Sequence, residues 1–173
     1  MALRALEEKD LEMLFDWRNS ENVRRFMFST HLISPAEHLQ WFEAIRADPR
    51  RHPMIFEHYG VSSGFVNIGP VHAGGVSKWG FYVSPQAPRG IGRLMGASAL
   101  SHAFATLRLH KVCGEALAGN MASCRFHLSL GFRQEGMLID EHFDGDAYQD
   151  VVRFGLLAAE WQASREVIDA EES

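Results

Sequence analysis

The sequence predicts a single domain of the mixed α/β class. Its 173 residues are 46% hydrophobic and 23% charged, which is typical of one globular domain that buries a full core. Stretches that alternate apolar and polar residues, as strands do, are interleaved with stretches that have helical spacing. The pair Asp144-Gly145 lies between two apolar runs and marks a β-hairpin. Helices between some strands and a hairpin between others indicate a mixed sheet.

The first fifty residues are predicted to be mainly helical. Residues 8–17 carry apolar side chains at helical spacing, and a short segment over 21–28 ends in an aromatic cluster. Ser34 opens the next helix, because Pro35 suits a first helical turn and Glu37 completes a capping box.

Strand signals dominate the middle and the end of the chain. The predicted strands are residues 54–56, 64–68, 79–83, 112–117, 137–143 and 148–157. Helices are predicted from the glycine-rich turn near residue 90 to about 109, and over 123–130. The domain is expected to span 1–173, with 161–173 as a frayed tail.

Composition excludes several classes of partner. The formal charge is −5 and no long basic run occurs, so nucleic acid is not an expected partner. Cys113 and Cys124 lack disulfide or CxxC spacing, and the histidines lack metal-ligand spacing. The acidic N-terminus and the absence of an 18-residue apolar run argue against a signal peptide or a membrane span. We therefore expect a cytoplasmic protein without a metal or a membrane partner.

The segment RGIGRLMG at residues 89–96 places glycines where a helix begins. Glycine inside a helix costs about 1 kcal/mol relative to alanine, so a need for bare backbone is indicated. A helix N-terminus offers unpaired N–H groups and a positive dipole end, and Arg89 and Arg93 add charge. These residues suit a phosphate or diphosphate, although the same residues also occur in an ordinary tight turn. No GK[ST] follows, so the segment is not a P-loop.

Two segments, FYVSPQAPRGIGRLMG and ALAGNMASCRFHLSLGF, together with the order of elements, resemble the GNAT superfamily of acyl-CoA-dependent N-acyltransferases. The resemblance covers most of residues 3–161. It implies a mixed, mostly antiparallel sheet of about seven strands with a V-shaped splay, flanked by about four helices. The family's turn usually begins with Gln or Arg where this chain has Ala87, and Arg89 is expected to compensate.

The resemblance also implies acetyl-CoA as cosubstrate, with the diphosphate at the glycine turn and pantetheine in the splay. The implied cofactor-binding residues are Phe81, Tyr82, Val83, Arg89, Gly90, Ile91, Gly92, Arg93, Leu94, Asn120 and Ser123.

For catalysis, the resemblance places the backbone N–H of Val83 at the oxyanion. Relatives have a tyrosine seven residues after the asparagine, as the acid for the thiolate, and this chain has His127 there. Imidazolium is a competent acid near neutral pH, so His127 is the predicted acid. The alternatives are a packing histidine in an active enzyme, or a non-catalytic acyl-CoA-binding module.

Within the superfamily, DWRNSENVRRFMFS, with the later Glu37-His38 and Trp41-Phe42, and HFDGDAYQDVVRFGLLAAEW resemble the nucleotide-sugar N-acetyltransferases of pseudaminic acid biosynthesis, which serve flagellin glycosylation. This implies direct acetyl transfer, in a ternary complex, to the 4-amino group of a UDP-linked 4-amino-4,6-dideoxy sugar. The expected substrate residues are Trp17, Arg18, Arg24, Arg25, Met27 and Trp79. A ribosomal-protein N-terminus or a polyamine stays open as acceptor, and a polyamine would favour an acidic pocket. The oligomeric state also stays open, with a homodimer as one possibility.

Overall fold

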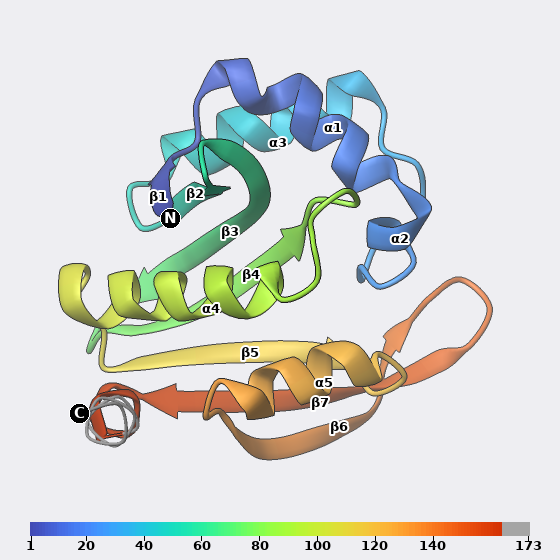
Figure 1. Cartoon of the computed structure of the whole chain (residues 1–173). Coiled ribbons are helices and arrows are strands. Elements are labelled where there is room, and N and C mark those ends of the chain that lie inside the picture. Colours follow the sequence, from blue (N-terminus) through green and yellow to red (C-terminus); the bar gives the residue numbers. More distant parts are fainter. Residues whose placement is uncertain (164–173) are drawn as a thin grey trace.

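A seven-stranded sheet with the order β1-β2-β3-β4-β5-β7-β6 runs through the computed structural model, which describes residues 1–163 (Figure 1). Neighbouring strands are antiparallel except β4 and β5, which are parallel. The predicted mixed, mostly antiparallel sheet is confirmed. Its strands are β1 (Ala2–Ala5), β2 (His52–His58), β3 (Val61–His72), β4 (Val76–Val83), β5 (Lys111–Leu117), β6 (Arg133–Phe143) and β7 (Tyr148–Leu157).

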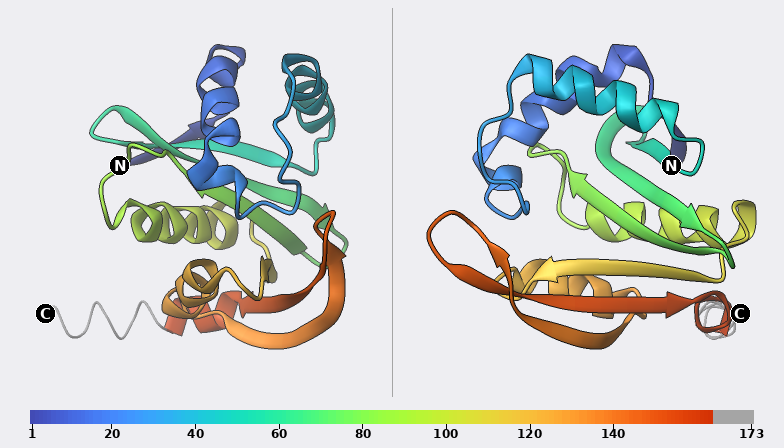
Figure 2. Two further views of the ribbon diagram at one scale, coloured as in Figure 1. Left: turned by 90° about the vertical axis from the view of Figure 1, so that its right-hand side faces the viewer. Right: turned by 180° about the vertical axis from the view of Figure 1, so that it is seen from behind.

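Helices lie on both sides of the sheet (Figure 2). They are η1 (Glu8–Asp10), α1 (Leu11–Asn19), α2 (Glu21–Arg24), α3 (Pro35–Ala47), α4 (Ile91–Ser101), η2 (His102–Thr106) and α5 (Met121–Ser129). α4 and α5 cover one face, while α1 and α3 pack together on the opposite side of the N-terminal strands (Figure 2). The predicted capping box of α3 is present, because Ser34 accepts from the Glu37 amide and the Glu37 carboxylate accepts from the Ser34 amide.

Two predicted boundaries were wrong. The helix expected to reach residue 109 is α-helical only to Ser101, after which η2 forms a π-helical turn. The expected frayed tail begins too early, because residues 158–163 are helical and Trp161 packs on Phe104. Residues 164–173 lie outside the described part of the chain. Among residues 1–163, no helix is both long enough and apolar enough to cross a membrane.

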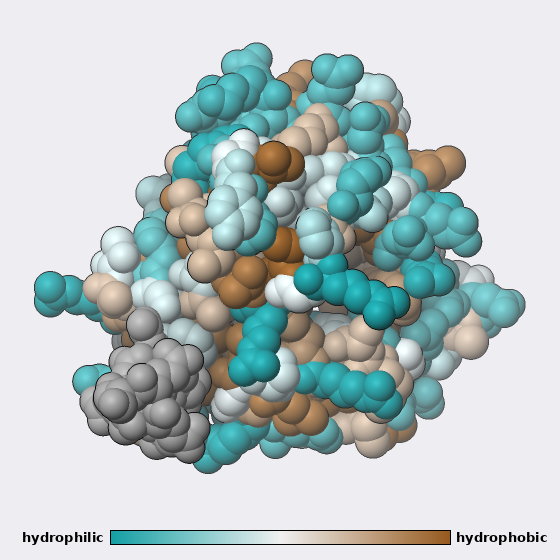
Figure 3. Space-filling view, viewed as in Figure 1, coloured by the Kyte–Doolittle hydropathy of each residue, from teal (hydrophilic) through white to brown (hydrophobic). Residues whose placement is uncertain are grey.

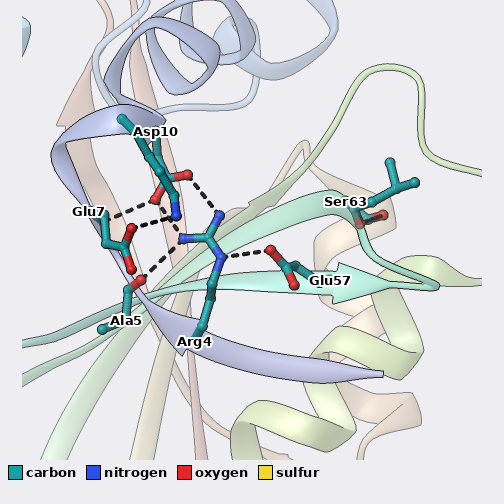
Figure 4. A network of polar contacts seen from close by, with 8 residues as sticks. Arg4, Ala5, Glu7, Asp10, Glu57 and Ser63 are labelled. Carbon is teal, nitrogen blue, oxygen red and sulfur yellow. Dashed lines mark hydrogen bonds and ion pairs between the residues drawn. The ribbon is translucent and has the colours of Figure 1, made fainter.

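Strand β1 has no counterpart in the predicted elements. Its sequence, ALRA, is too short for a periodic signal, and the strand is held by distant partners (Figure 4). The Arg4 guanidinium donates to both Asp10 carboxylate oxygens at 2.7 Å and to Glu57 Oε1 at 2.6 Å. Burial alone would raise the pKa of Asp10, but the bonds from Arg4 and from the Glu7 amide hold that pKa below its ordinary value.

The sheet opens between β4 and β5. These strands pair only at Val76 with Lys111, Ser77 with Val112 and Lys78 with Cys113. Beyond that point β4 stays paired to β3 as far as Val83, and β5 stays paired to β7 as far as Leu117. The two strands therefore separate toward the end near α2, which is the predicted V-shaped splay (Figure 1).

Candidate active site

The turn that leads from β4 into α4 presents bare backbone. Gly90 is the N-cap of α4 with φ 90°, a left-handed conformation that favours glycine, and no atom lies within 4 Å of the place where its Cβ would be. The N–H groups of Arg89, Gly90 and Gly92 make no hydrogen bond to the described part of the chain. An anion can therefore approach the positive end of α4 closely.

The side chains of this turn divide into two groups. Arg89, Arg93 and Leu94 are exposed, so the two guanidinium groups can reach a bound phosphate. Ile91 is 2% exposed and packs with Phe56 and Met95 in the core. The predicted cofactor role of Ile91 is accordingly limited to its backbone.

Gly96 is needed for close packing, whereas Gly90 is needed for its backbone conformation. A Cβ on Gly96 would lie 2.6 Å from Leu130 Cδ1 and 2.8 Å from Phe126 Cζ. The missing side chain lets α4 pack closely against Phe126, which lines the splay, and against Leu130 in the core. The glycines of the turn thus serve both an anion site and close helix packing.

A cavity of about 560 Å³, here called the splay cavity, fills the opening between β4 and β5. It is lined by Asn22, Val23, Phe26, Met27, Phe28, Lys78, Trp79, Gly80, Phe81, Tyr82, Val83, Glu115, Ala116, Leu117, Asn120, Ala122, Ser123 and Phe126. Five predicted cofactor residues, Phe81, Tyr82, Val83, Asn120 and Ser123, are among them. On the face that carries α4 and α5, patches of apolar side chains are exposed between strongly polar ones (Figure 3). The splay cavity suits the slender, mostly apolar arm of a coenzyme thioester.

Backbone groups of β4 face the splay cavity. The Ser84 amide donates to the Ser63 carbonyl at 2.9 Å, which makes Gly64 and Val83 a non-hydrogen-bonded pair in the β3–β4 ladder. The N–H of Val83 therefore points away from β3 and toward the splay. This is the direction that its predicted oxyanion role requires.

A second cavity, of about 320 Å³, lies on the other side of β4 and is here called the acceptor cavity. It is lined by Arg18, Met27, Ile33, Glu37, His38, Trp41, Ile45, Arg51, Phe65, Asn67, Gly80, Phe81 and Tyr82. Met27, Gly80, Phe81 and Tyr82 line both cavities. Two ligands, one in each cavity, would meet at this stretch of β4.

The charged groups of the acceptor cavity are mainly cationic. Arg18 is 9% exposed; its Nη2 donates to the Ser29 carbonyl at 2.6 Å, and its Nη1 is buried with no partner among residues 1–163. Arg51 lies 3.5 Å from the Asp48 carboxylate. Bonds from the Ser34 amide and His31 lower the pKa of Glu37 to about 2, so its carboxylate is already engaged.

The predicted substrate residues do not all meet at a cavity. Arg18, Met27 and Trp79 line one or both cavities, but Trp17 is 7% exposed and packs in the core formed with α3. Arg24 donates to the Thr30 carbonyl at 2.8 Å, and Arg25 is exposed with its guanidinium over Phe26. The structure places Trp17, Arg24 and Arg25 outside both cavity linings, because two of them stabilise the fold and the third lies on the surface.

His127 lies behind the splay cavity rather than in it. It is 1% exposed, stacks on Phe154 at a ring distance of 4.6 Å, and lies at van der Waals distance from the backbone of β5. A Cβ on Gly114 would come within 2.6 Å of the imidazole, so that glycine makes room for the ring.

Both ring nitrogens of His127 are engaged. Nδ1 donates to the Ser123 carbonyl at 2.8 Å, and Nε2 accepts from the Trp79 indole N–H at 3.1 Å. Since an indole N–H only donates, protonation of Nε2 would place two donors face to face. Burial also lowers the pKa of His127. This geometry favours a neutral packing histidine, the alternative named above, over the predicted acid.

Several residues of the acceptor cavity were missed as site residues. They come from α3, the turn after it and β3, and are His38, Trp41, Arg51, Phe65 and Asn67. His38 and Trp41 share one side of α3 three residues apart, which in a sequence is typical of core packing. No local signal could have separated that role from a place in the cavity wall.

The comparisons with known proteins agree with this geometry. Residues 1–133 match the family described as acetyltransferase (GNAT) domain. Spermidine N(1)-acetyltransferase of Vibrio cholerae is 25% identical over 93% of this chain and 95% of its own length. An uncharacterized prophage-derived N-acetyltransferase of Bacillus subtilis, YokL, is 27% identical over 94% and 92% of the two chains.

A solved structure has the same fold. The crystal structure of spermidine N-acetyltransferase from Vibrio cholerae in complex with CoA and spermine superposes with a TM-score of 0.85, at 23% identity, over 93% of this chain and 97% of that one. None of these three is named for a nucleotide sugar, so the GNAT resemblance is confirmed and the narrower pseudaminic-pathway resemblance is not. The chain therefore belongs to the GNAT family of acetyltransferases and is an N-acetyltransferase that uses acetyl-CoA as its cosubstrate.

Proposed function

We propose that the chain transfers an acetyl group directly from acetyl-CoA to a primary amine of a small molecule, with both substrates bound at once. The observation that carries this proposal is the shared wall of the two cavities at Met27 and Gly80–Tyr82. An amine in the acceptor cavity and a thioester in the splay cavity can approach each other there without a covalent acetyl-enzyme. Holding two reactants in this way lowers the entropic part of the barrier.

The cofactor is held mainly by backbone. The free amides of Arg89, Gly90 and Gly92, with the Arg89 and Arg93 side chains, bind the diphosphate, and Val83 supplies its N–H to the oxyanion. Asn120 stabilises the α5 side of the slot, because its Oδ1 accepts from the Ser123 amide at 3.1 Å.

The first candidate acceptor is a nucleotide-linked amino sugar, as the pseudaminic-pathway resemblance suggests. The charge of the acceptor cavity supports it, since Arg18 and Arg51 face one engaged carboxylate, Glu37. Met27 and Trp41 offer apolar surface for a deoxysugar ring. The buried Arg18 Nη1 and Asn67 Oδ1 also lack partners among residues 1–163, which favours a ligand with polar groups beside its amine.

The second candidate acceptor is a polyamine. It is supported by the names of the Vibrio cholerae relatives, which act on spermidine. A polycation would be repelled by Arg18 and Arg51, and the cavity offers it one carboxylate. Relatives thus favour the polyamine, and local charge favours an acceptor that carries anionic groups.

A single assay separates these candidates. Release of free CoA thiol is measured with acetyl-CoA and, in turn, a UDP-4-amino-4,6-dideoxy sugar, spermidine and a ribosomal-protein N-terminal peptide. We expect the highest kcat/KM with the sugar. Efficient turnover of spermidine with none of the sugar would overturn that choice. CoA binding without turnover of any of the three would mean that the acceptor is an amine of another class.

A further inference from the structure

We propose that His38 accepts the proton of the acceptor amine and that Tyr82 protonates the departing thiolate. This inference rests on the proposed function. It assigns the acid role that was predicted for His127 and the base role, which has had no candidate. Each residue is placed by contacts from elements that are distant in sequence.

His38 is a fixed, neutral imidazole in the wall of the acceptor cavity. It is 6% exposed, and its Nε2 lies 2.9 Å from the Leu11 carbonyl. A carbonyl only accepts, so Nε2 carries the hydrogen and the lone pair is on Nδ1. The ring stacks on Trp41 at 5.2 Å and 15°, which holds its orientation.

No hydrogen bond from Nδ1 of His38 exists among residues 1–163. The contrast with His127 is direct, because there both nitrogens are used. Burial, assisted by the charge of Arg18, lowers the pKa of His38, so its lone pair is available at neutral pH.

The other titratable groups of the acceptor cavity are poor bases. Arg18 and Arg51 carry guanidinium groups, which donate hydrogen bonds and offer no acceptor. Glu37 has a pKa of about 2 and is bonded to His31 and Ser34. Burial raises the pKa of Tyr82, which keeps its phenol protonated. His38 is the one group in this lining whose neutral form has a free basic site near pH 7.

Tyr82 is suited to the opposite role. It lines both cavities, and its hydroxyl donates to no residue among 1–163. Its ring packs on Phe65 at 5.2 Å, which fixes its place on β4. Burial raises the pKa of this phenol and keeps its proton in place, and the positive charge of Arg18 offsets part of that rise. Two groups with pKa values displaced in opposite senses beside one reaction path are typical of an acid–base pair.

The amine nitrogen forms a bond to the acetyl carbon and gives one proton to His38 Nδ1, while the C–S bond breaks and its electron pair stays on sulfur. The sulfur then takes the Tyr82 hydroxyl proton. After the products leave, His38 releases its proton to solvent and the phenolate regains one from water.

The first test is His38→Gln, assayed with the best amine of the panel. Glutamine can still donate to the Leu11 carbonyl but is not a base. We expect kcat to fall by roughly 10²–10⁴, with the Kd for CoA from calorimetry unchanged. The acid limb of the kcat profile, below the ordinary histidine pKa of 6.5, should disappear. Arg18, Glu37, Arg51 and Tyr82 are the other charged or titratable groups in this lining, and all remain in the variant.

The second test is Tyr82→Phe, which keeps the ring contact and removes the proton. We expect kcat to fall at least about tenfold with the Kd for CoA unchanged. His102→Gln and Tyr148→Phe are matched controls, because these residues line neither cavity. His102 also has a pKa lowered by burial, so it controls for a general effect of removing such a histidine.

A measurement on the ring itself completes the test. Nitrogen NMR of His38 should show the hydrogen on Nε2 and a free Nδ1. A hydrogen on Nδ1 would overturn the base role of His38. So would a His38→Gln variant with wild-type kcat and an unchanged acid limb. Wild-type kcat in Tyr82→Phe would overturn the acid. If the wild-type protein acetylates no amine, the proposed function fails first; if it does and the variants match it, this inference fails alone.

Discussion

The splay cavity and the acceptor cavity meet at β4, yet they are built from different atoms. On the splay side the binding groups are mainly backbone: free amides at Gly90 and Gly92, and the unpaired edge of β4. On the acceptor side they are side chains from α1, α3, the turn after α3, and β3, brought together only by folding. A ligand shared by a whole family can be held by backbone, whereas an individual acceptor must be recognised by side chains.

This difference sets which changes should affect which substrate. Substitutions in the turn should weaken the binding of CoA, whichever amine is the acceptor. Substitutions in the acceptor lining should change KM for the amine and leave the Kd for CoA unchanged. The residues of β4 that both cavities share are the place where the two effects should combine.

The largest effect is expected from Gly92→Glu. A Cβ at this position meets only ordinary contacts, 3.5 Å from Val83 Cγ2, so the variant should fold. Its carboxylate would occupy the anion site at the start of α4. Loss of one or two charge-assisted hydrogen bonds at about 1.5–3 kcal/mol each should raise the calorimetric Kd for CoA by roughly 10²–10⁴.

Gly136→Glu is the control for that variant. It adds the same charge on β6, where the position is also open, and should leave CoA binding unchanged. Equal loss in both variants would mean that net charge, and not the turn, governs affinity.

The next effect is expected from His127→Phe, and it concerns stability. Removing the acceptor leaves the Trp79 indole N–H buried and unpaired, at a cost of about 1–3 kcal/mol in the free energy of unfolding. We expect a lower Tm and a change in kcat of less than about tenfold. Wild-type Tm with kcat reduced by roughly 10²–10⁴ would instead restore the predicted acid role.

The same residue gives a pH signature. The pKa of His127 in the fold lies below its ordinary 6.5, so the unfolded chain binds the extra proton first. Its contribution to stability is therefore present above pH 6.5 and is lost as the pH falls toward the folded value. Denaturant titrations should show this loss in the wild-type protein and a smaller one in His127→Phe.

The contrast between the two cavities also marks what could be predicted from the sequence. The role of Gly90 and Gly92 can be predicted from the residues beside them, because the strand, turn and helix of this segment are contiguous in the sequence. β1 could not be predicted in this way. Ala2–Ala5 becomes a strand by pairing with β2, and Arg4 is held by Glu57 on that strand and by Asp10 in η1.

Side-chain roles depend on orientation, which spacing does not give. Trp17 and Trp41 look alike in the sequence, but one packs in the core and the other lines the acceptor cavity. His127 has the position from which the resemblance predicted an acid, yet its ring fills the space left by Gly114 and accepts from the Trp79 indole in the core.

A smaller effect, with an informative sign, is expected from Arg51→Gln. Arg51 lines the acceptor cavity from a surface turn and its side chain is 36% exposed, so the fold should not suffer. The partly screened attraction between Arg51 and an anionic acceptor contributes about 1 kcal/mol. Its loss should raise KM for such an acceptor roughly threefold to tenfold. For a polyamine KM should fall, so initial rates with both amines identify the acceptor by direction alone.

The smallest effect is expected from Arg93→Gln, with Arg25→Gln as its control. Both arginines are exposed, but only Arg93 stands beside the anion site of the turn. An exposed charge pair contributes about 0.2–1 kcal/mol, so the Kd for CoA should rise no more than about fivefold, and the difference from the wild-type protein should vanish as salt shortens the Debye length. A salt-independent loss of a hundredfold would mean that the side chain, rather than the bare amides, carries the diphosphate. The CoA site would then depend on side chains, as the acceptor cavity does, and the contrast between the two cavities would be wrong.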